Sequence, residues 1–259
     1  MQKTGKERPV AVVTGGSSGI GAALARALHR RGYLCVLLAR GEERLRRVAA
    51  EIDGEYETCD VGDREAVERV AARVLARHPR LHLLVNNAGV PGRAGFLDAD
   101  PERIELVTRV NYLGSVWCLR AFLPGLQAAG RARVVNVVSV AGAVAGAGTS
   151  GPYTASKHAQ LAFSRSVAAE LAFRGIRVHT LLPGFVETEG FPQRRVLPRP
   201  LHRIVIEPGE VAEAVLRALD RDRAEVYVPR YYQLVAIAQV IAPRLVSRLG
   251  RSARVRKPA

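Results

Sequence analysis

Short apolar runs alternate with longer amphipathic segments through most of the 259 residues of the chain. A run that is apolar throughout is typical of a strand buried on both faces, and the helical segment after it supplies a crossover to a parallel neighbour. The sequence therefore predicts an α/β fold: a doubly wound, mostly parallel seven-stranded sheet with helices on both faces. We predict strands at residues 10–14, 34–38, 55–59, 83–86, 134–138, 177–182 and 225–228, and helices near residues 20–31, 42–52, 64–77, 101–126, 153–173 and 208–220.

The formal net charge of +15 requires an explanation, because strongly basic chains often bind nucleic acid. The basic residues are scattered, however, and aromatic residues make up only 5% of the chain, so we expect no nucleic-acid partner. Cys35, Cys59 and Cys118 are far apart and suit a reducing compartment, and no metal site is expected. His179, within an apolar run, is expected to be a satisfied core histidine. No signal segment or membrane-spanning run is recognisable, which predicts a cytoplasmic protein.

A glycine-rich segment, TGGSSGIG at residues 14–21, follows the first predicted strand and opens the first predicted helix. Glycines there allow a tight turn and let the backbone approach a phosphate, while the helix N-terminus offers free amides. The spacing differs from the dinucleotide fingerprint GxGxxG, and a plain strand-to-helix turn is the alternative. The position at the first strand–helix junction favours a cofactor phosphate.

The end of the second predicted strand bears on the choice of cofactor. In dinucleotide folds an acidic residue at this place binds the ribose 2′-hydroxyl, whereas an arginine accommodates a 2′-phosphate. The strand here is followed by Ala39 and Arg40, and the first acid is Glu42. A guanidinium binds phosphate in a charge-assisted fork, so we predict NADP(H) rather than NAD(H). The alternative is that Arg40 is a solvated loop charge.

Tyr153 and Lys157 are four residues apart in a predicted helix and therefore share one face. A phenol has an ordinary pKa of about 10, and a neighbouring ammonium should lower that pKa by favouring the phenolate. Such a pair fits acid–base chemistry, and it fits a solvated helix face as well. The adjacent His158 points away from that face and is expected at the surface or in an interface.

Three motifs in this order resemble the short-chain dehydrogenase/reductase family: TGGSSGIG at 14–21, NNAG at 86–89, and Tyr153-x-x-x-Lys157. The resemblance extends from about residue 9 to residue 228. It implies a single Rossmann-like domain and an NADP(H)-dependent oxidoreductase that interconverts a carbonyl (ketone or aldehyde) and an alcohol. It also implies a homodimer or homotetramer.

The resemblance further implies roles for residues at matching positions. The catalytic set would be Asn111, Ser139, Tyr153 and Lys157. In it Tyr153 is the general acid/base, Ser139 donates to the developing oxyanion, and Asn111 helps to hold a relay water against Lys157. Asn86 would tie neighbouring strands together. The cofactor-binding positions would be Gly15, Ser17, Ser18, Gly19, Ile20, Gly21, Arg40, Asp60, Val61, Asn87, Ala88, Gly89, Tyr153, Lys157, Pro183, Gly184, Val186 and Thr188.

Several of these residues have a plainer interpretation. Ser139 could be a strand cap, Asn111 a helix-bend residue and Thr188 a turn residue. Ser150 is a second hydroxyl close to Tyr153 in the sequence. A catalytically idle relative that binds NADP(H) as a regulatory or interaction protein is the alternative function.

The segment 183–208 is rich in proline and arginine and predicts a lid at about residues 189–207. We expect an apolar carbonyl or alcohol substrate in a pocket beneath this lid. Arginines of the lid could meet an anionic group on the substrate or be solvated. The expected apolar lining is Phe185, Phe191, Val196, Leu197, Leu201 and Ile204, and the lid arginines are Arg194, Arg195, Arg199 and Arg203.

Residues 230–259 are predicted as a C-terminal segment outside the catalytic domain at residues 1–229. They read as an apolar helix, broken or kinked near Pro243, with a basic end, and no acidic residue follows Glu225. Three alternatives remain open: a helix that covers the pocket or a neighbouring subunit, a peripheral contact with an anionic membrane, and a disordered tail. A lipid-surface module is accordingly a further alternative function.

Overall fold

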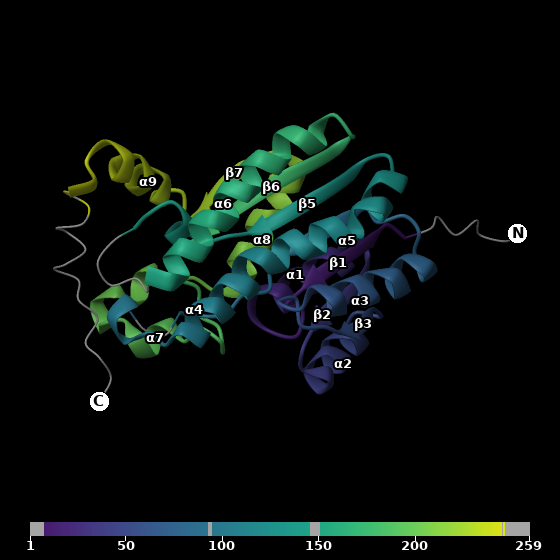
Figure 1. The fold of residues 1–259 in the computed structure, drawn as a ribbon, viewed down its shortest axis with the longest axis horizontal. Coiled ribbons are helices and arrows are strands. Elements are labelled where there is room, and N and C mark those ends of the chain that lie inside the picture. Colours follow the sequence, from purple (N-terminus) through teal and green to yellow (C-terminus); the bar gives the residue numbers. More distant parts are fainter. Residues whose placement is uncertain (1–7, 93–94, 146–150, 245, 247–259) are drawn as a thin grey trace, which may run out of the picture.

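A computed structural model describes residues 8–92, 95–145, 151–244 and 246. Its centre is a sheet of seven strands, paired in parallel throughout, in the order β3-β2-β1-β4-β5-β6-β7 (Figure 1). This sheet, with helices on both of its faces, confirms the fold class predicted from the sequence. The strands are β1 (Val10–Thr14), β2 (Leu34–Ala39), β3 (Glu55–Thr58), β4 (Leu83–Asn86), β5 (Ala132–Val137), β6 (Ile176–Pro183) and β7 (Glu225–Val228).

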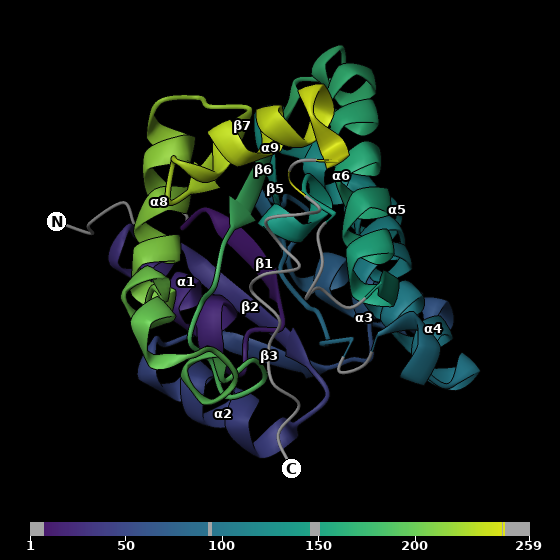
Figure 2. The ribbon, with the colours of Figure 1, turned by 90° about the vertical axis from the view of Figure 1, so that its left-hand side faces the viewer.

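The helices form two layers, one on each face of the sheet (Figures 1 and 2). One layer consists of α1 (Gly19–Arg30), α2 (Glu42–Glu51) and α8 (Pro208–Asp220), and the other contains α3 (Arg64–Arg77), α5 (Gly114–Ala128) and α6 (Gly151–Ala172). Each layer buries its own apolar cluster against the strands. α4 (Pro101–Thr108), α7 (Gln193–Val196) and α9 (Tyr232–Ile241) lie at the end of the molecule where the strands finish.

The strand order reverses between β1 and β4, which creates a crevice at their carboxyl ends. Thr14 closes the base of this crevice, because its Oγ1 accepts hydrogen bonds from the backbone N–H groups of Asn87 (2.9 Å) and Ala88 (3.0 Å). One strand further, the Asn86 side chain donates to Asn136 Oδ1 at 2.9 Å. This bond joins β4 to β5 and confirms that Asn86 ties neighbouring strands.

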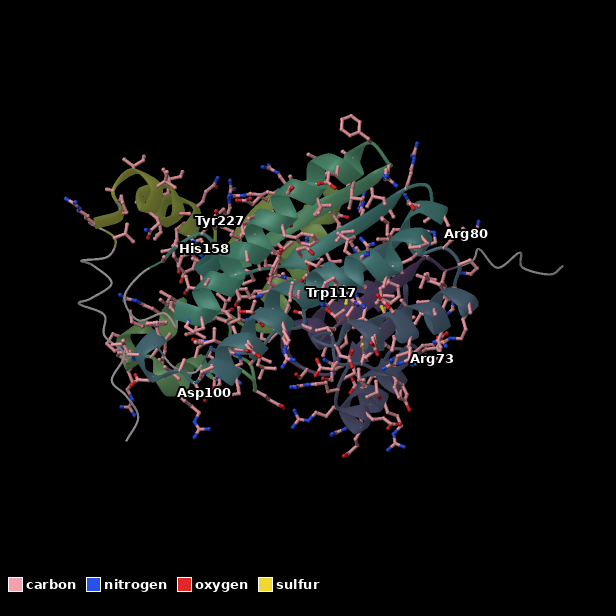
Figure 3. The ribbon with its side chains drawn as sticks, viewed as in Figure 1. Arg73, Arg80, Asp100, Trp117, His158 and Tyr227 are labelled. Atoms are coloured by element: carbon pink, nitrogen blue, oxygen red, sulfur yellow. The ribbon has the colours of Figure 1, made fainter. Side chains whose placement is uncertain are left out.

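Side-chain caps fix where several helices begin. Asp63 accepts a hydrogen bond from Ala66 N at the start of α3. Asp100, which Figure 3 labels beside α4, caps that helix by accepting from Arg103 N at 2.6 Å. These caps satisfy backbone donors that a helix start would otherwise leave unpaired. The starts of these two helices, at Arg64 and Pro101, agree with the helix starts predicted from the sequence.

The prediction of a single helix over residues 101–126 is wrong in the middle of that range. A π-helical segment, Arg109–Leu113, separates α4 from α5. Its Asn111 side chain turns back to the backbone of Val90, accepting from N at 2.7 Å and donating to O at 3.1 Å. Gly114 then allows close packing, because a Cβ there would lie 2.9 Å from Val61 Cγ2. The wider turn accommodates these contacts, which a helical sequence pattern does not reveal.

The remaining core predictions agree with the structure. Cys35, Cys59 and Cys118 are buried and unpaired. His179 is buried and forms a hydrogen bond through Nδ1 with Arg223 O at 2.8 Å, while its Nε2 has no partner among the described residues. The prediction of a satisfied core histidine thus holds for one ring nitrogen. Within the described ranges no helix is long and apolar enough to cross a membrane.

We expect Gly21→Ala to destabilise the fold, because a Cβ at Gly21 would lie 2.2 Å from the carbonyl oxygen of Gly15 and 2.6 Å from Asn87 Nδ2. Moving this backbone should cost about 1–3 kcal/mol of the free energy of unfolding, measured by urea titration. Gly209→Ala is the matched control, since nothing lies within 4 Å of a Cβ there. It should be neutral or stabilising by up to about 1 kcal/mol. Equal effects of the two variants would contradict the steric explanation.

Candidate active site

The glycine turn between β1 and α1 forms one wall of the site. Gly15 has φ +67° and Gly19 has φ +52°, values that favour glycine, and Gly15 N donates to Leu38 O at 2.7 Å. A Cβ at Gly15 would lie 2.8 Å from Asn87 Nδ2. The N-cap of α1 is Ser18, whose side chain makes no capping hydrogen bond, and the first turn contains no acid. The helix N-terminus therefore presents amides without a competing carboxylate, which suits an anion.

A cavity of about 740 Å³ extends from this turn across the carboxyl ends of the strands. Every residue that the sequence assigned to the cofactor or to catalysis lines the cavity, apart from two. Gly21 packs against Gly15 instead, and Asn111 is buried behind the wall. Ser150 lies outside the described residues. The sequence assignments thus converge on one cavity, of the size that small-molecule sites usually have.

Tyr153, in the first turn of α6, lies beside the end of β5. Burial raises the pKa of Tyr153 to about 12, and a hydrogen bond with the Ser139 side chain opposes that rise. Ser139 Oγ also accepts from Ala141 N at 3.1 Å, so it caps the turn after β5 as well as meeting the tyrosine. The Phe191 ring packs against Tyr153, with ring centroids 5.9 Å apart. Tyr153 therefore keeps its proton at neutral pH in this structure.

Lys157, one helical turn further along α6, is only 3% exposed. Its Nζ donates to Gln160 Oε1 at 2.7 Å and to Val137 O at 3.3 Å, and lies 6.0 Å from the centre of the Tyr153 ring. Burial lowers the pKa of Lys157 to about 7. The prediction that the pKa of Tyr153 falls is therefore wrong for this structure, because burial is the largest influence on that pKa and the Lys157 amine contributes no opposing attraction.

Gln160 was not recognised from the sequence. It is 1% exposed, accepts from Lys157, and donates through Nε2 to Ser115 Oγ at 2.8 Å. The available signal was its spacing, since residues at i and i+3 share a helix face. Ser115, Gln160 and Lys157 form a chain of hydrogen bonds that orients the buried amine.

Asn111 belongs to a second buried group of polar side chains. Besides its two bonds to Val90, its Nδ2 donates to Ser156 Oγ at 3.1 Å, and Ser156 Oγ donates to Tyr153 O at 2.7 Å. Asn111 thereby connects the segment after β4 to the backbone of the tyrosine. It also lies in the π-helical segment, as the helix-bend interpretation expected. Its role in holding a relay water stays a prediction.

Two arginines line the other end of the cavity. Arg40 is exposed and has no ion pair with another described residue, whereas Arg44 forms an ion pair with Glu189 of the lid. The sequence assignment missed Arg44, which lies four residues after Arg40 in the first turn of α2. Nearby, Asp60 Oδ1 accepts a hydrogen bond from Gly62 N at 2.9 Å. The cavity thus has a cationic end at β2 and α2.

The lid begins and ends at a parallel bridge between Val186 and Ile206. Thr188 Oγ1 accepts from Phe191 N at 3.1 Å, so Thr188 is a turn residue here. Its methyl group also lies 3.0 Å from where a Cβ of Gly19 would be, which brings the lid against the glycine turn.

The expected apolar lining of the lid is correct only in part. Phe185 and Phe191 line the cavity, whereas the other four predicted residues do not. The lid forms α7 and a 3₁₀ helix, Arg199–Ile204, and these helices place the four side chains outside the cavity. Arg194 forms an ion pair with Glu207, with Arg194 Nη2 and Glu207 Oε1 2.7 Å apart. The four apolar residues outside the cavity lining are Val196, Leu197, Leu201 and Ile204.

α9 covers the cavity from the side of β7. Tyr232 and Val235 line the cavity, and a Cβ at Gly184 would lie 2.2 Å from Tyr232 Cε2. Of the three alternatives for the C-terminal segment, the structure supports the pocket-covering helix for these residues. The end of the segment, residues 247–259, lies outside the described residues.

His158, labelled on α6 in Figure 3, is partly buried, and its Nδ1 forms a hydrogen bond with Thr154 O at 2.9 Å.

Comparison with known proteins supports this picture. The profile of short chain dehydrogenases matches residues 9–196. A putative ketoacyl reductase of Streptomyces coelicolor is 33% identical over 244 residues, which cover 92% of this chain and 90% of that protein. The alcohol dehydrogenase of Thermococcus sibiricus, solved with 5-hydroxy-NADP, is 32% identical with a TM-score of 0.77, covering 85% of this chain and 96% of that one. A Burkholderia phymatum short chain dehydrogenase/reductase solved with NAD is 26% identical with a TM-score of 0.82. The match covers 93% of this chain and 95% of that one.

The doubly wound sheet, its glycine turn and the cavity at the strand ends are the features of a dinucleotide-binding enzyme fold. The family profile covers well over half of the chain. The chain therefore belongs to the short-chain dehydrogenase/reductase family and is an oxidoreductase.

The titration of Lys157 predicts how stability depends on pH. Its folded pKa of about 7 lies below the ordinary value of 10.5, so between these values the unfolded chain binds one more proton. The free energy of unfolding should therefore rise with pH. The Lys157→Met variant lacks this titration. The difference, wild type minus variant, should grow by up to about 1.4 kcal/mol per pH unit, measured by urea unfolding between about pH 7.5 and pH 9.5. A constant difference across this window would mean that Lys157 stays charged when buried.

Proposed function

We propose that the protein is an NADP(H)-dependent carbonyl reductase that acts on an apolar ketone or aldehyde, with Tyr153 as the proton donor. The observation that carries the proposal is the position of Tyr153. It lies in the cavity, partly buried and hydrogen-bonded to Ser139, with Lys157 one helical turn away.

The residues at the cationic end fit NADP(H). The glycine turn and the uncapped start of α1 suit the pyrophosphate, while Arg40 and Arg44 supply two guanidinium groups for a 2′-phosphate. Similar structures carry either cofactor, 5-hydroxy-NADP in one and NAD in another, so family membership alone does not decide. The absence of an acid between Ala39 and Glu42 favours the phosphorylated form.

The proton in the reaction comes from this chain. The cofactor, when bound, supplies the hydride that reduces the carbonyl carbon. Tyr153, whose pKa of about 12 keeps it protonated, donates its phenolic proton to the carbonyl oxygen, and the product is the alcohol. The Ser139 hydroxyl donates a hydrogen bond to the same oxygen while charge develops on it. Lys157, with a pKa of about 7, is suited to return a proton to the phenolate near neutral pH.

The substrate end of the cavity is apolar. Val144, Phe185, Tyr232 and Val235 line it and belong to one apolar cluster under α9. Phe191 of the lid packs on the Tyr153 ring. These walls suit a substrate whose carbonyl is attached to hydrocarbon. The name of the Streptomyces coelicolor relative, a putative ketoacyl reductase, agrees with a ketone.

Replacement of the proton donor tests the proposal. Tyr153→Phe should lower kcat for NADPH-dependent reduction of apolar ketones by about 10²–10⁴-fold, because the acid is lost while the ring remains. Turnover is followed by the absorbance of NADPH, and cofactor binding by its fluorescence. Binding should change little. Unchanged residual turnover would refute the role of Tyr153, and cofactor binding without turnover of any carbonyl by the wild type would indicate an idle relative.

The cofactor choice has its own test. Arg40→Ser and Arg44→Ser should each reduce kcat/KM for NADPH by roughly 10–100-fold, because each removes a hydrogen bond to a charged group, and should leave kcat/KM for NADH nearly unchanged. Arg47→Ser is the matched control on α2, since Arg47 is exposed, pairs with Glu43 and does not line the cavity. An equal loss with both cofactors would exclude a 2′-phosphate contact.

A further inference from the structure

The large apolar side chains that remain exposed gather at one end of the molecule. Of the nine exposed large hydrophobic residues in the described ranges, Phe173 alone lies at the opposite end, between α6 and β6. The other eight belong to the 3₁₀ turn before α4, to α7, and to α9 with the residue that precedes it. Figures 1 and 2 show α4 and α9 at the end where the strands finish. The eight are Phe96, Leu97, Val196, Tyr231, Leu234, Ile237, Val240 and Ile241.

α9 is apolar on both of its sides. Its inner side packs over the cavity through Tyr232 and Ala236, which are buried. On its outer side Leu234 is 70% exposed, Val240 81% and Ile241 77%. Gln233 is also exposed and interrupts this outer side, yet a helix that is apolar on both sides is ordinarily covered on both of them. Covering the cavity therefore accounts for only one side of α9, and the outer side requires an apolar environment of its own.

The charge around α9 indicates what that environment is. Arg230 precedes the helix and Arg244 follows it, and both are exposed. No acidic residue follows Glu225 in the sequence, whereas five more cations lie between Arg248 and Lys257. Arginines of the lid, at 195, 199 and 203, are also exposed and have no ion pair with a described residue. An apolar helix face flanked by unpaired cations is complementary to a surface with hydrocarbon beneath anionic groups.

A second copy of the chain suits this face less well. A two-fold contact through α9 would bring its arginines towards their own counterparts, and the helix offers no carboxylate to pair with them. An anionic lipid surface has no such conflict. α9 has ten residues and could lie only in the plane of the surface, without spanning it.

We propose that the outer face of α9 docks on an anionic lipid bilayer. Leu234, Ile237, Val240 and Ile241 enter the boundary between headgroups and acyl chains, and Arg230 and Arg244 contact the lipid phosphates. Because Tyr232 and Val235 of the same helix line the cavity, docking places the covered side of the cavity next to the membrane.

Cosedimentation of the full chain with vesicles tests the proposal. The chain should bind vesicles of phosphatidylcholine with phosphatidylglycerol, bind poorly to phosphatidylcholine alone, and lose affinity as salt is added. Leu234→Ser with Ile237→Ser should weaken binding by roughly tenfold for each side chain that enters the acyl region. Arg230→Ser with Arg244→Ser should weaken it by roughly fivefold per charge, on anionic vesicles only.

Phe173→Ser is the matched control, because Phe173 is 94% exposed but lies at the opposite end of the molecule. It should leave vesicle binding unchanged. If the first double variant does not fold by circular dichroism, Val240→Ser with Ile241→Ser replaces it. The proposal is overturned if the wild-type chain does not bind anionic vesicles, or if the α9 variants bind them as tightly as the wild type does. It is equally overturned if light scattering finds a dimer that the same substitutions dissociate, since a second copy would then cover α9.

Discussion

The reversal of strand order between β1 and β4 is the constraint on which the site depends. At this point Thr14 accepts two backbone hydrogen bonds from the chain after β4, and Asn87 Nδ2 donates to Thr14 O at 2.9 Å. Two segments far apart in sequence are thereby held so close that Gly15 and Gly21 have no room for a side chain. The same contact sets the direction of α1 and keeps its N-terminus at the cavity. The N-terminus of α1, which suits an anion, therefore lies at the crevice of this open sheet.

Burial rather than charge pairing governs the acid–base groups. Lys157 is buried and Tyr153 is partly buried, and the reduced contact with water favours the neutral form of each, raising the pKa of Tyr153 and lowering that of Lys157. Gln160 and the carbonyl of Val137 satisfy the amine without adding a negative charge. The site therefore holds a protonated phenol near neutral pH, which is the form that reduction of a carbonyl consumes.

The sequence predicted what depends on local pattern and missed what depends on tertiary contact. β1, β4 and β7 have the predicted bounds, because buried parallel strands are short apolar runs between turns. Most residues of the cavity were predicted from the resemblance to a known family, and only the glycine turn and Arg40 were argued from their places at strand ends. The π-helical segment was missed because it depends on the bond between Asn111 and Val90. The pKa of Tyr153 was expected to fall because sequence shows a neighbouring charge and does not show burial.

Chemistry and substrate choice are carried by different parts of the chain. The residues proposed to hold the cofactor phosphates and to move the proton lie at the ends of β1, β2 and β5 and on α1, α2 and α6, within the doubly wound core. The apolar walls around Tyr153 come from later segments, Phe185 and Phe191 before and within the lid, and Tyr232 and Val235 on α9. These later segments pack their inward sides against the core, for example Tyr232 against Gly184 and Thr188 against Gly19. Their outward sides are therefore free to differ without disturbing the acid–base groups, and in this chain the outward side of α9 is apolar and flanked by arginines.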